Sequence, residues 1–123
     1  MEVPRPTDQD KERFRALVPD DPRVTVKPMF GNLGAFVNGN MFLGLLGPAI
    51  GLKLNETDRA FLLAEEGAGP FGPAGTPMGG YVALPPALAA DPFKAEIWVA
   101  KALDYVGAFP PKAKASKKKS ELS

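Results

Sequence analysis

The sequence predicts an α+β fold of two layers, in which an antiparallel sheet of about five strands has helices packed on one face. Three observations predict this class. Between residues 24 and 54, short apolar runs alternate with turns that contain glycine. Apolar residues at helical spacing occur before this region and twice after it. A further strand pattern at residues 81–84 separates the last two helices, so the expected element order is α-β-β-β-(β)-α-β-α.

The first helix is expected to begin after Thr7, because threonine side chains cap helix N-termini. Asp8 and Asp10 follow in the first turn, where the helix dipole favours negative charge. The apolar face of this helix consists of Phe14, Leu17 and Val18. The helix is expected to end at Pro19. Its apolar face is expected to pack against the core.

Residues 24–54 are expected to form an antiparallel meander. Its first strand should lie at a sheet edge, because Pro28 has no amide proton for a central ladder. Gly31-Asn32 is expected to form the first turn, and Asn38-Gly39 a type I′ hairpin turn, since both of its residues tolerate positive φ. We expect the phenylalanines of this region in the core, and the glycines within strands to leave room for a helix lying across the sheet.

Two more helices are expected after the meander. Asn55 caps the first of them, which ends at Gly67. Residues 67–80 are rich in glycine and proline, which predicts a loop with a brief extended piece at Phe71. Asp91-Pro92 is a typical start for the long final helix. The buried stripe of that helix is expected to contain Ala95, Trp98, Val99, Ala102, Val106 and Phe109.

A chain of 123 residues has room for one domain. We expect a flexible N-terminus at residues 1–6, the domain at residues 7–109 and a disordered, lysine-rich tail at residues 110–123. Residues 1–111 carry ten Lys/Arg and thirteen Asp/Glu, a net charge of −3. The last twelve residues carry five lysines and one glutamate, a net charge of +4, so a mildly acidic body is joined to a basic tail.

The composition removes several kinds of chemistry. The chain has no cysteine and no histidine, so thiol chemistry and the commonest general base and metal ligand are absent. No loop shows the alternating Asp/Asn spacing of a calcium site, and we expect no metal. The segment GAGPFG at residues 67–72 fits G-x-G-x-x-G but follows a helix and opens none, so we expect no cofactor. No apolar run approaches the roughly 20 residues of a membrane helix, so we expect a cytoplasmic protein that does not bind membranes.

Three segments in order carry a family resemblance: KPMFGNLGAFVNGNMFLGLL, LKLNETDRAFLL and MGGYVALPPALAADP. Together they resemble the TfoX/Sxy N-terminal domain family over about residues 8–108. Members of that family have a K-x-M-F-G-G step, and this chain has Asn32 in place of the second glycine. Its loop at residues 67–80 is also richer in glycine and proline than is usual for the family.

The resemblance implies an antiparallel sheet with helices on one face. It also implies a role related to regulators of natural competence, which act through transcription. The family has no known set of catalytic residues, so none is transferred to this chain.

Three groups of residues are candidates for contact with a partner. Lys27, Arg59 and Tyr81 match family-like positions and could meet on one surface. The alternative is that they are unrelated: a charge on a strand face, a charge on a helix surface and a half-buried aromatic ring. Phe93 and Ile97 form an i, i+4 apolar pair opposite the buried stripe. This pair is either covered by residues 85–90 or exposed as a docking patch for a second copy or another protein. The tail lysines are candidate polyanion contacts without sequence preference: Lys112, Lys114, Lys117, Lys118 and Lys119.

Three functions are compatible with these observations. The first is a non-enzymatic regulatory domain that acts through contacts with a protein partner or through self-association. The second is a transcriptional regulator that touches nucleic acid through its basic tail. The third, a small enzyme that uses carboxylates, would have to work without histidine or cysteine.

Overall fold

The computed structural model describes residues 5–73 and 76–111. Predictions made for residues 1–4 and for tail residues 112–123 lie outside the described residues. The sheet has six strands in the order β1-β2-β3-β4-β6-β5, and every neighbouring pair is antiparallel. The strands are β1 (Val24–Met29), β2 (Asn32–Val37), β3 (Asn40–Leu46), β4 (Ala49–Lys53), β5 (Gly69–Pro70) and β6 (Tyr81–Ala83). The helices are α1 (Asp8–Leu17), α2 (Glu56–Leu63), α3 (Pro86–Ala89) and α4 (Pro92–Gly107).

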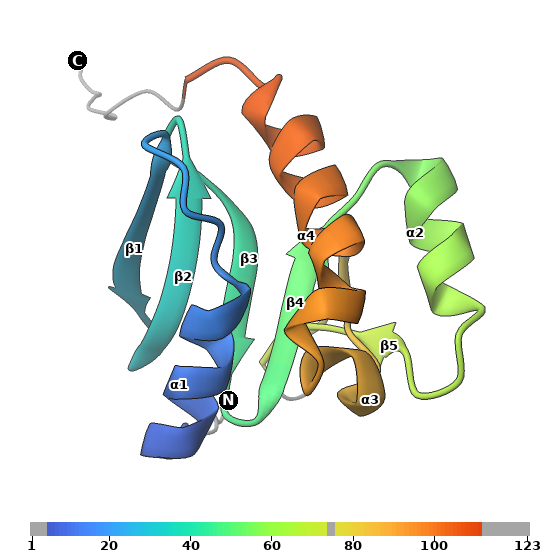
Figure 1. Ribbon diagram of the computed structural model, residues 1–123. Helices are drawn as coiled ribbons and strands as arrows, with labels where there is room; N and C mark the ends of the chain where they lie inside the picture. Colours follow the sequence, from blue (N-terminus) through green and yellow to red (C-terminus); the bar gives the residue numbers. More distant parts are fainter. Residues whose placement is uncertain (1–4, 74–75, 112–123) are drawn as a thin grey trace.

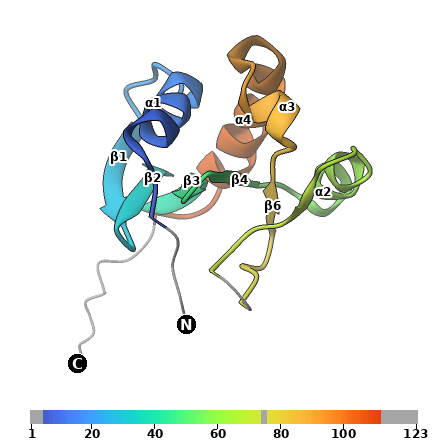
Figure 2. The same cartoon turned by 90° about the horizontal axis from the view of Figure 1, so that it is seen from below.

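The predicted α+β class is confirmed. Figure 1 shows α4 running along the sheet, and Figure 2 shows α1, α3 and α4 together on one side of it with α2 beside β6. Two elements are additions to the predicted order, the short helix α3 and the two-residue strand β5, which lies directly before Phe71, where a brief extended piece was expected. Both are too short to show a period in the sequence, which is why the pattern of apolar residues does not indicate them.

The core lies between the sheet and the helices. Phe14 of α1 is fully buried there, as the spacing of the first helix predicts. Helix α4 begins at the predicted position, where the Asp91 carboxylate accepts a hydrogen bond from the backbone N–H of Lys94 at 3.2 Å. The buried residues of α4 are Ala95, Val99, Ala102, Leu103 and Val106. Leu103 is an addition to the predicted stripe, and Trp98 is only partly buried.

The β2–β3 hairpin turns at Asn38-Gly39, as predicted. Both residues have positive φ, 54° and 77°, which is the requirement of a type I′ turn. Strand β1 is also at the sheet edge, as Pro28 predicts.

The first hairpin turns one residue earlier than predicted. Phe30 and Gly31 have φ values of 53° and 74°, and Asn32 is the first residue of β2. The Asn32 side chain is buried, accepts a hydrogen bond from the backbone N–H of Gly47 at 2.7 Å and donates one to the carbonyl of Phe30 at 3.2 Å. Asn32 therefore ties the β1–β2 turn to the β3–β4 turn from the first position of β2, not from within the turn as expected.

The glycines within strands face away from the helices, which corrects the expectation that they leave room for one. Gly34, Gly44 and Gly51 lie directly opposite one another on β2, β3 and β4. A methyl group on Gly51 would overlap the ring of Phe71, and one on Gly44 would come within 3.0 Å of Met41. The row of glycines thus accommodates side chains on the second face of the sheet, chiefly the buried ring of Phe71 from the loop after β5.

None of the helices in the described ranges has the length and apolar character needed to cross a bilayer.

Candidate functional site

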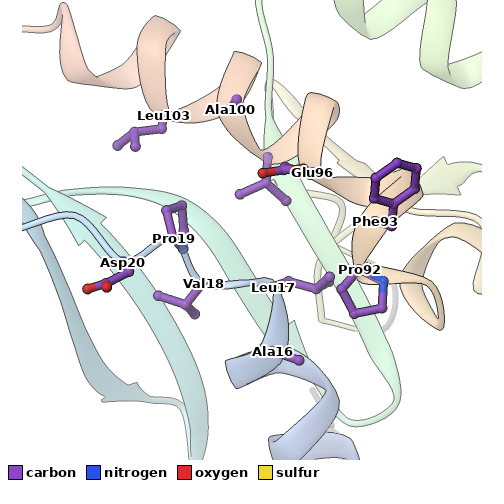
Figure 3. Close-up of a pocket in the computed structure, with 11 residues that line it drawn as sticks. Ala16, Leu17, Val18, Pro19, Asp20, Pro92, Phe93, Glu96, Ala100 and Leu103 are labelled. Atoms are coloured by element: carbon purple, nitrogen blue, oxygen red, sulfur yellow. The ribbon is translucent and has the colours of Figure 1, made fainter.

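Two grooves lie on opposite sides of the sheet, and each is lined by one of the predicted site residues, Phe93 in the first and Tyr81 in the second. The first, the helix groove, has a volume of about 480 Å³ and lies between the end of α1 and the outer side of α4 (Figure 3). Val18 follows α1 in an extended conformation, with ψ at 124°, so the chain leaves the helix axis and forms one wall. The lining residues are Ala16, Leu17, Val18, Pro19, Asp20, Pro92, Phe93, Glu96, Val99, Ala100 and Leu103.

Nine of the eleven residues that line the helix groove are apolar, and the other two are acidic. Leu17 and Val99 are buried and belong to the core, so the groove opens directly over it. Asp20 and Glu96 are the only charged residues among those that line it. Figure 3 shows the ring of Phe93 at one end of the groove, close to the start of α4. Such a surface fits an apolar segment that carries positive charge.

Phe93 and Ile97 are exposed in the structure, by 86% and 60% respectively. The alternative that residues 85–90 cover them is therefore wrong. Those residues form α3, whose Ala89 is buried and whose Leu88 packs against the core, so the apolar side chains of the segment turn inward. The outer side of α4 remains uncovered beside the helix groove.

Helix α2 also has exposed apolar side chains. Phe61 and Leu63 are 67% and 47% exposed, whereas Leu62 between them is fully buried. Helices α2 and α4 are linked by an ion pair in which Lys101 Nζ lies 3.9 Å from Asp58 Oδ1. Sequence reasoning did not single out Phe61, although the run Phe61-Leu62-Leu63 places apolar residues on more faces of α2 than a single buried stripe needs.

The second groove, the sheet-face groove, lies on the side of the sheet opposite the helices and has a volume of about 300 Å³. Its lining residues are Met29, Phe30, Phe36, Asn40, Met41, Lys53, Met78, Tyr81 and Phe109. The expectation that the meander phenylalanines are core is confirmed for Phe42, which is fully buried, and wrong for Phe30, which is 61% exposed. Phe30 occupies the turn with φ at 53°, outside the alternation that would direct its ring inward.

Tyr81 anchors the middle of the sheet-face groove. Its hydroxyl donates a hydrogen bond to the carbonyl of Met41 at 2.7 Å, and burial raises the pKa of the phenol to about 12. The Lys53 ammonium lies 5.4 Å from the ring centre of Tyr81 and 5.4 Å from that of Phe109. Sequence reasoning missed Lys53, although its alternation with Leu52 places it on the same face as Gly51.

The predicted cluster of Lys27, Arg59 and Tyr81 is only partly brought together. Lys27 shares the sheet face with Tyr81, and its ammonium lies 4.6 Å from the centre of the Phe36 ring. Arg59 instead donates a hydrogen bond to the carbonyl of Leu54 at 2.9 Å, where β4 leads into α2. Arg59 therefore holds the strand end in place, and Lys53 is the charged residue among those that line the groove.

In the part of the chain that the structure describes, no group of three or more His, Cys, Asp or Glu residues is placed to hold a metal ion. With a pKa near 12, the Tyr81 phenol keeps its proton at neutral pH and can donate a hydrogen bond but not act as a base.

The structure is a small α+β domain with a groove on each side of its sheet. The chain matches the family model of the TfoX N-terminal domain over residues 8–106, and it belongs to this family. A comparison with curated proteins gives no match. The match begins at the first residue of α1 and ends one residue before the last residue of α4, so it spans all the helices and strands described above.

Proposed function

We propose that this domain is a non-enzymatic regulatory module that acts through a protein contact at the helix groove. The observation that carries the proposal is the exposure of Phe93 and Ile97, 86% and 60%, beside a groove that opens over the core. Scattered apolar residues are normal on surfaces, but a bulky pair next to an apolar groove is typical of docking sites. Membership of the TfoX N-terminal domain family supports a role in transcription regulation related to competence.

The chemistry of the groove indicates the kind of partner. Asp20 and Glu96 are its only charged lining residues, and both are acidic. A partner segment with apolar side chains and nearby lysines or arginines would match the apolar floor and the two carboxylates together. A single amphipathic helix is the common occupant of a groove of this kind. We therefore expect another protein rather than a second copy of this chain in the groove.

Site-specific crosslinking tests this proposal. A photo-crosslinking phenylalanine analogue replaces Phe93 in the full chain, and the matched control carries it at Phe61, an exposed residue of α2 that does not line the groove. We expect position 93 to crosslink to an apolar segment flanked by basic residues, and position 61 not to do so. The Ile97→Lys variant should weaken the contact about tenfold or more, because it places a charge beside Phe93 in the exposed apolar pair.

The Ile97→Lys test needs a measurement of the stability of the variant as well as of its association with the partner. Ile97 is 60% exposed, so Ile97→Lys should unfold at the same urea concentration as the wild type. A loss of stability would mean that the side chain belongs to the core, and the docking proposal would fail. A crosslinked product of twice the mass of this chain would show self-association instead of a partner and would contradict the proposed occupant.

A further inference from the structure

The sheet-face groove has the lining of a site for a small organic molecule. Four of its nine lining residues are aromatic and three are methionines, so it offers rings and polarisable thioethers to an apolar ligand. Its volume of about 300 Å³ is at the lower end of the range for small-molecule pockets. Lys53 is the charged residue of the lining, and no carboxylate is part of it. The groove therefore combines an apolar lining with one positive charge.

The floor of the groove consists of side chains that cover the glycine row. A methyl group on Gly34 would come within 2.8 Å of the Phe36 ring and within 3.0 Å of the Met41 sulfur, so both side chains lie directly over this glycine. Met41 is 7% exposed, and its carbonyl accepts the hydrogen bond from the Tyr81 hydroxyl. The floor is therefore closed, and its position is fixed by the packing of the sheet.

Hydrogen bonds hold the wall that Phe109 forms. The side-chain amide of Asn40 donates to the carbonyl of Pro110 at 3.2 Å. The side-chain amide of Asn38 donates to the carbonyl of Gly107 at 3.3 Å. These bonds attach the chain to the β2–β3 hairpin on both sides of Phe109, so the wall is in place before a ligand binds, which lowers the entropy cost of binding.

Lys53 is the hydrogen-bond donor that the lining leaves for a ligand. The Tyr81 hydroxyl and the Asn40 amide, which also line the groove, already donate to backbone carbonyls. In the described ranges the Lys53 ammonium has no ion-pair partner, and it lies 5.4 Å from the ring centres of Tyr81 and Phe109. An anion in the groove gains a charge-assisted hydrogen bond that the protein itself does not make.

We propose that the sheet-face groove binds a small aromatic carboxylate. The ring of the ligand packs on Phe36 and Met41, and its carboxylate pairs with the Lys53 ammonium. This inference goes beyond the protein contact proposed above, and it uses the opposite side of the sheet.

The lining favours this class of ligand over three others. A small inorganic anion would pair with Lys53 but would leave the rings and thioethers without a partner. An uncharged aromatic compound would use the rings but would leave the ammonium unpaired. A cation would be attracted by the rings but repelled by the ammonium that already lies beside two of them.

NMR of the full chain, labelled with ¹³C at the methionine methyl groups, tests the inference. Three of the four methionines line the groove, so their signals report directly on its occupancy: Met29, Met41 and Met78. The probes are phenylacetate, its uncharged analogue phenylacetamide, and acetate. We expect phenylacetate to shift the three signals with a Kd of about 1 mM or tighter, and each of the other two probes to bind about tenfold more weakly.

A lysine variant and a matched control assign the effect to Lys53. Lys53→Gln should lower the affinity for phenylacetate about tenfold and leave that for phenylacetamide unchanged, because it removes the charge and keeps the apolar lining. Lys94→Gln alters an exposed lysine of α4 outside the groove and should bind like the wild type. Urea denaturation checks that both variants are folded, and the comparison of the three probes on the wild type needs no variant.

The inference is wrong if phenylacetate does not shift the three methionine signals at about ten times the expected Kd. It is also wrong if phenylacetamide binds as tightly as phenylacetate, since the charge would then not contribute. Equal binding of acetate and phenylacetate would exclude a role of the rings. A folded Lys53→Gln variant that binds phenylacetate like the wild type would show that the carboxylate does not pair with Lys53.

Discussion

Among the glycines of the strands, Gly51 has the least room for a side chain, because the ring of Phe71 lies against it. A methyl group at position 51 would overlap the ring of Phe71, which is 1% exposed and held against β4. Neither partner can move easily, because Gly51 is paired with Gly44 on one side and Ala83 on the other. The absence of a side chain at Gly51 is thus a packing requirement of the second sheet face.

We predict that Gly51→Ala lowers the free energy of unfolding by about 1–3 kcal/mol, the usual range for overpacking a buried site. Urea denaturation followed through the fluorescence of Trp98, the single tryptophan, measures the change. The matched control is Gly69→Ala, on the strand beside β6, where a methyl group would meet nothing within 4 Å. Equal stability of Gly51→Ala and the wild type would show that the ring does not lie against Gly51.

At the scale of single residues, local preferences could be predicted from the sequence and distant contacts could not. The Asn38-Gly39 turn was predictable because both residues favour the backbone angles that the turn needs. The partner of Gly51 is twenty positions away, in a loop whose glycines and prolines carry no periodic signal, so its identity depends on tertiary packing alone. Phe30 shows the same limit, since a phenylalanine with positive φ contradicts the preference of its residue type.

The capping box of α1 is the clearest example of an element whose stability depends on pH. The Thr7 hydroxyl accepts the backbone N–H of Asp10 at 3.0 Å, and the Asp10 carboxylate accepts the backbone N–H of Thr7 at 2.9 Å. The bond from the Thr7 backbone is the main cause that holds the pKa of Asp10 below its ordinary value of 3.8, and a contact with Arg13 at 3.2 Å adds to it.

We predict that Asp10→Asn lowers stability at neutral pH and that the difference from the wild type shrinks in acid. The native pKa of Asp10 lies below its unfolded value, so its contribution is complete above the unfolded pKa and is lost as the pH falls through the native one. Thr7→Ala should cost about 1 kcal/mol at neutral pH, because it removes the helix cap. Part of this cost should also disappear in acid, because the Thr7 side chain contributes to the lowered pKa of Asp10. Urea denaturation of both variants at a series of pH values between neutral and strongly acidic gives the comparison. A constant deficit for Asp10→Asn would mean that its charge does not contribute.

Among the elements, the starts of the helices and the position of the edge strand could be predicted from the sequence. Which elements pack beside the outer side of α4 could not. Thr7, Asn55 and Asp91 each accept a hydrogen bond from a backbone N–H in the first turn of the helix that follows, which is a local signal. The helix groove instead depends on how the chain leaves α1 at Val18 and passes along α4. Sequence periodicity places Phe93 and Ile97 on the outer side of α4, but only the direction of α3 decides whether anything covers them.

Across the whole molecule, the sheet separates two surfaces of different chemistry. The helix groove is lined by apolar residues and two carboxylates, whereas the sheet-face groove is lined by aromatic residues, methionines and a lysine. The core between the sheet and the helices is continuous and closely packed, with Phe14, Phe42 and Val106 fully buried. The two grooves share no lining residue, so a change in either one can be made without touching the other.

We predict that the two surfaces act independently. Ile97→Lys should weaken the protein contact, whereas Phe30→Ala should leave it unchanged, because both side chains are exposed and lie on opposite sides of the sheet. The change in the free energy of unfolding of the double variant should be the sum of the two single changes within about 0.5 kcal/mol, as expected for distant sites without common contacts. Urea denaturation and crosslinking yield on the same four proteins test this. A double variant that departs from the sum by more than that margin, or a Phe30→Ala variant that loses the contact, would mean that the two faces are coupled through the sheet.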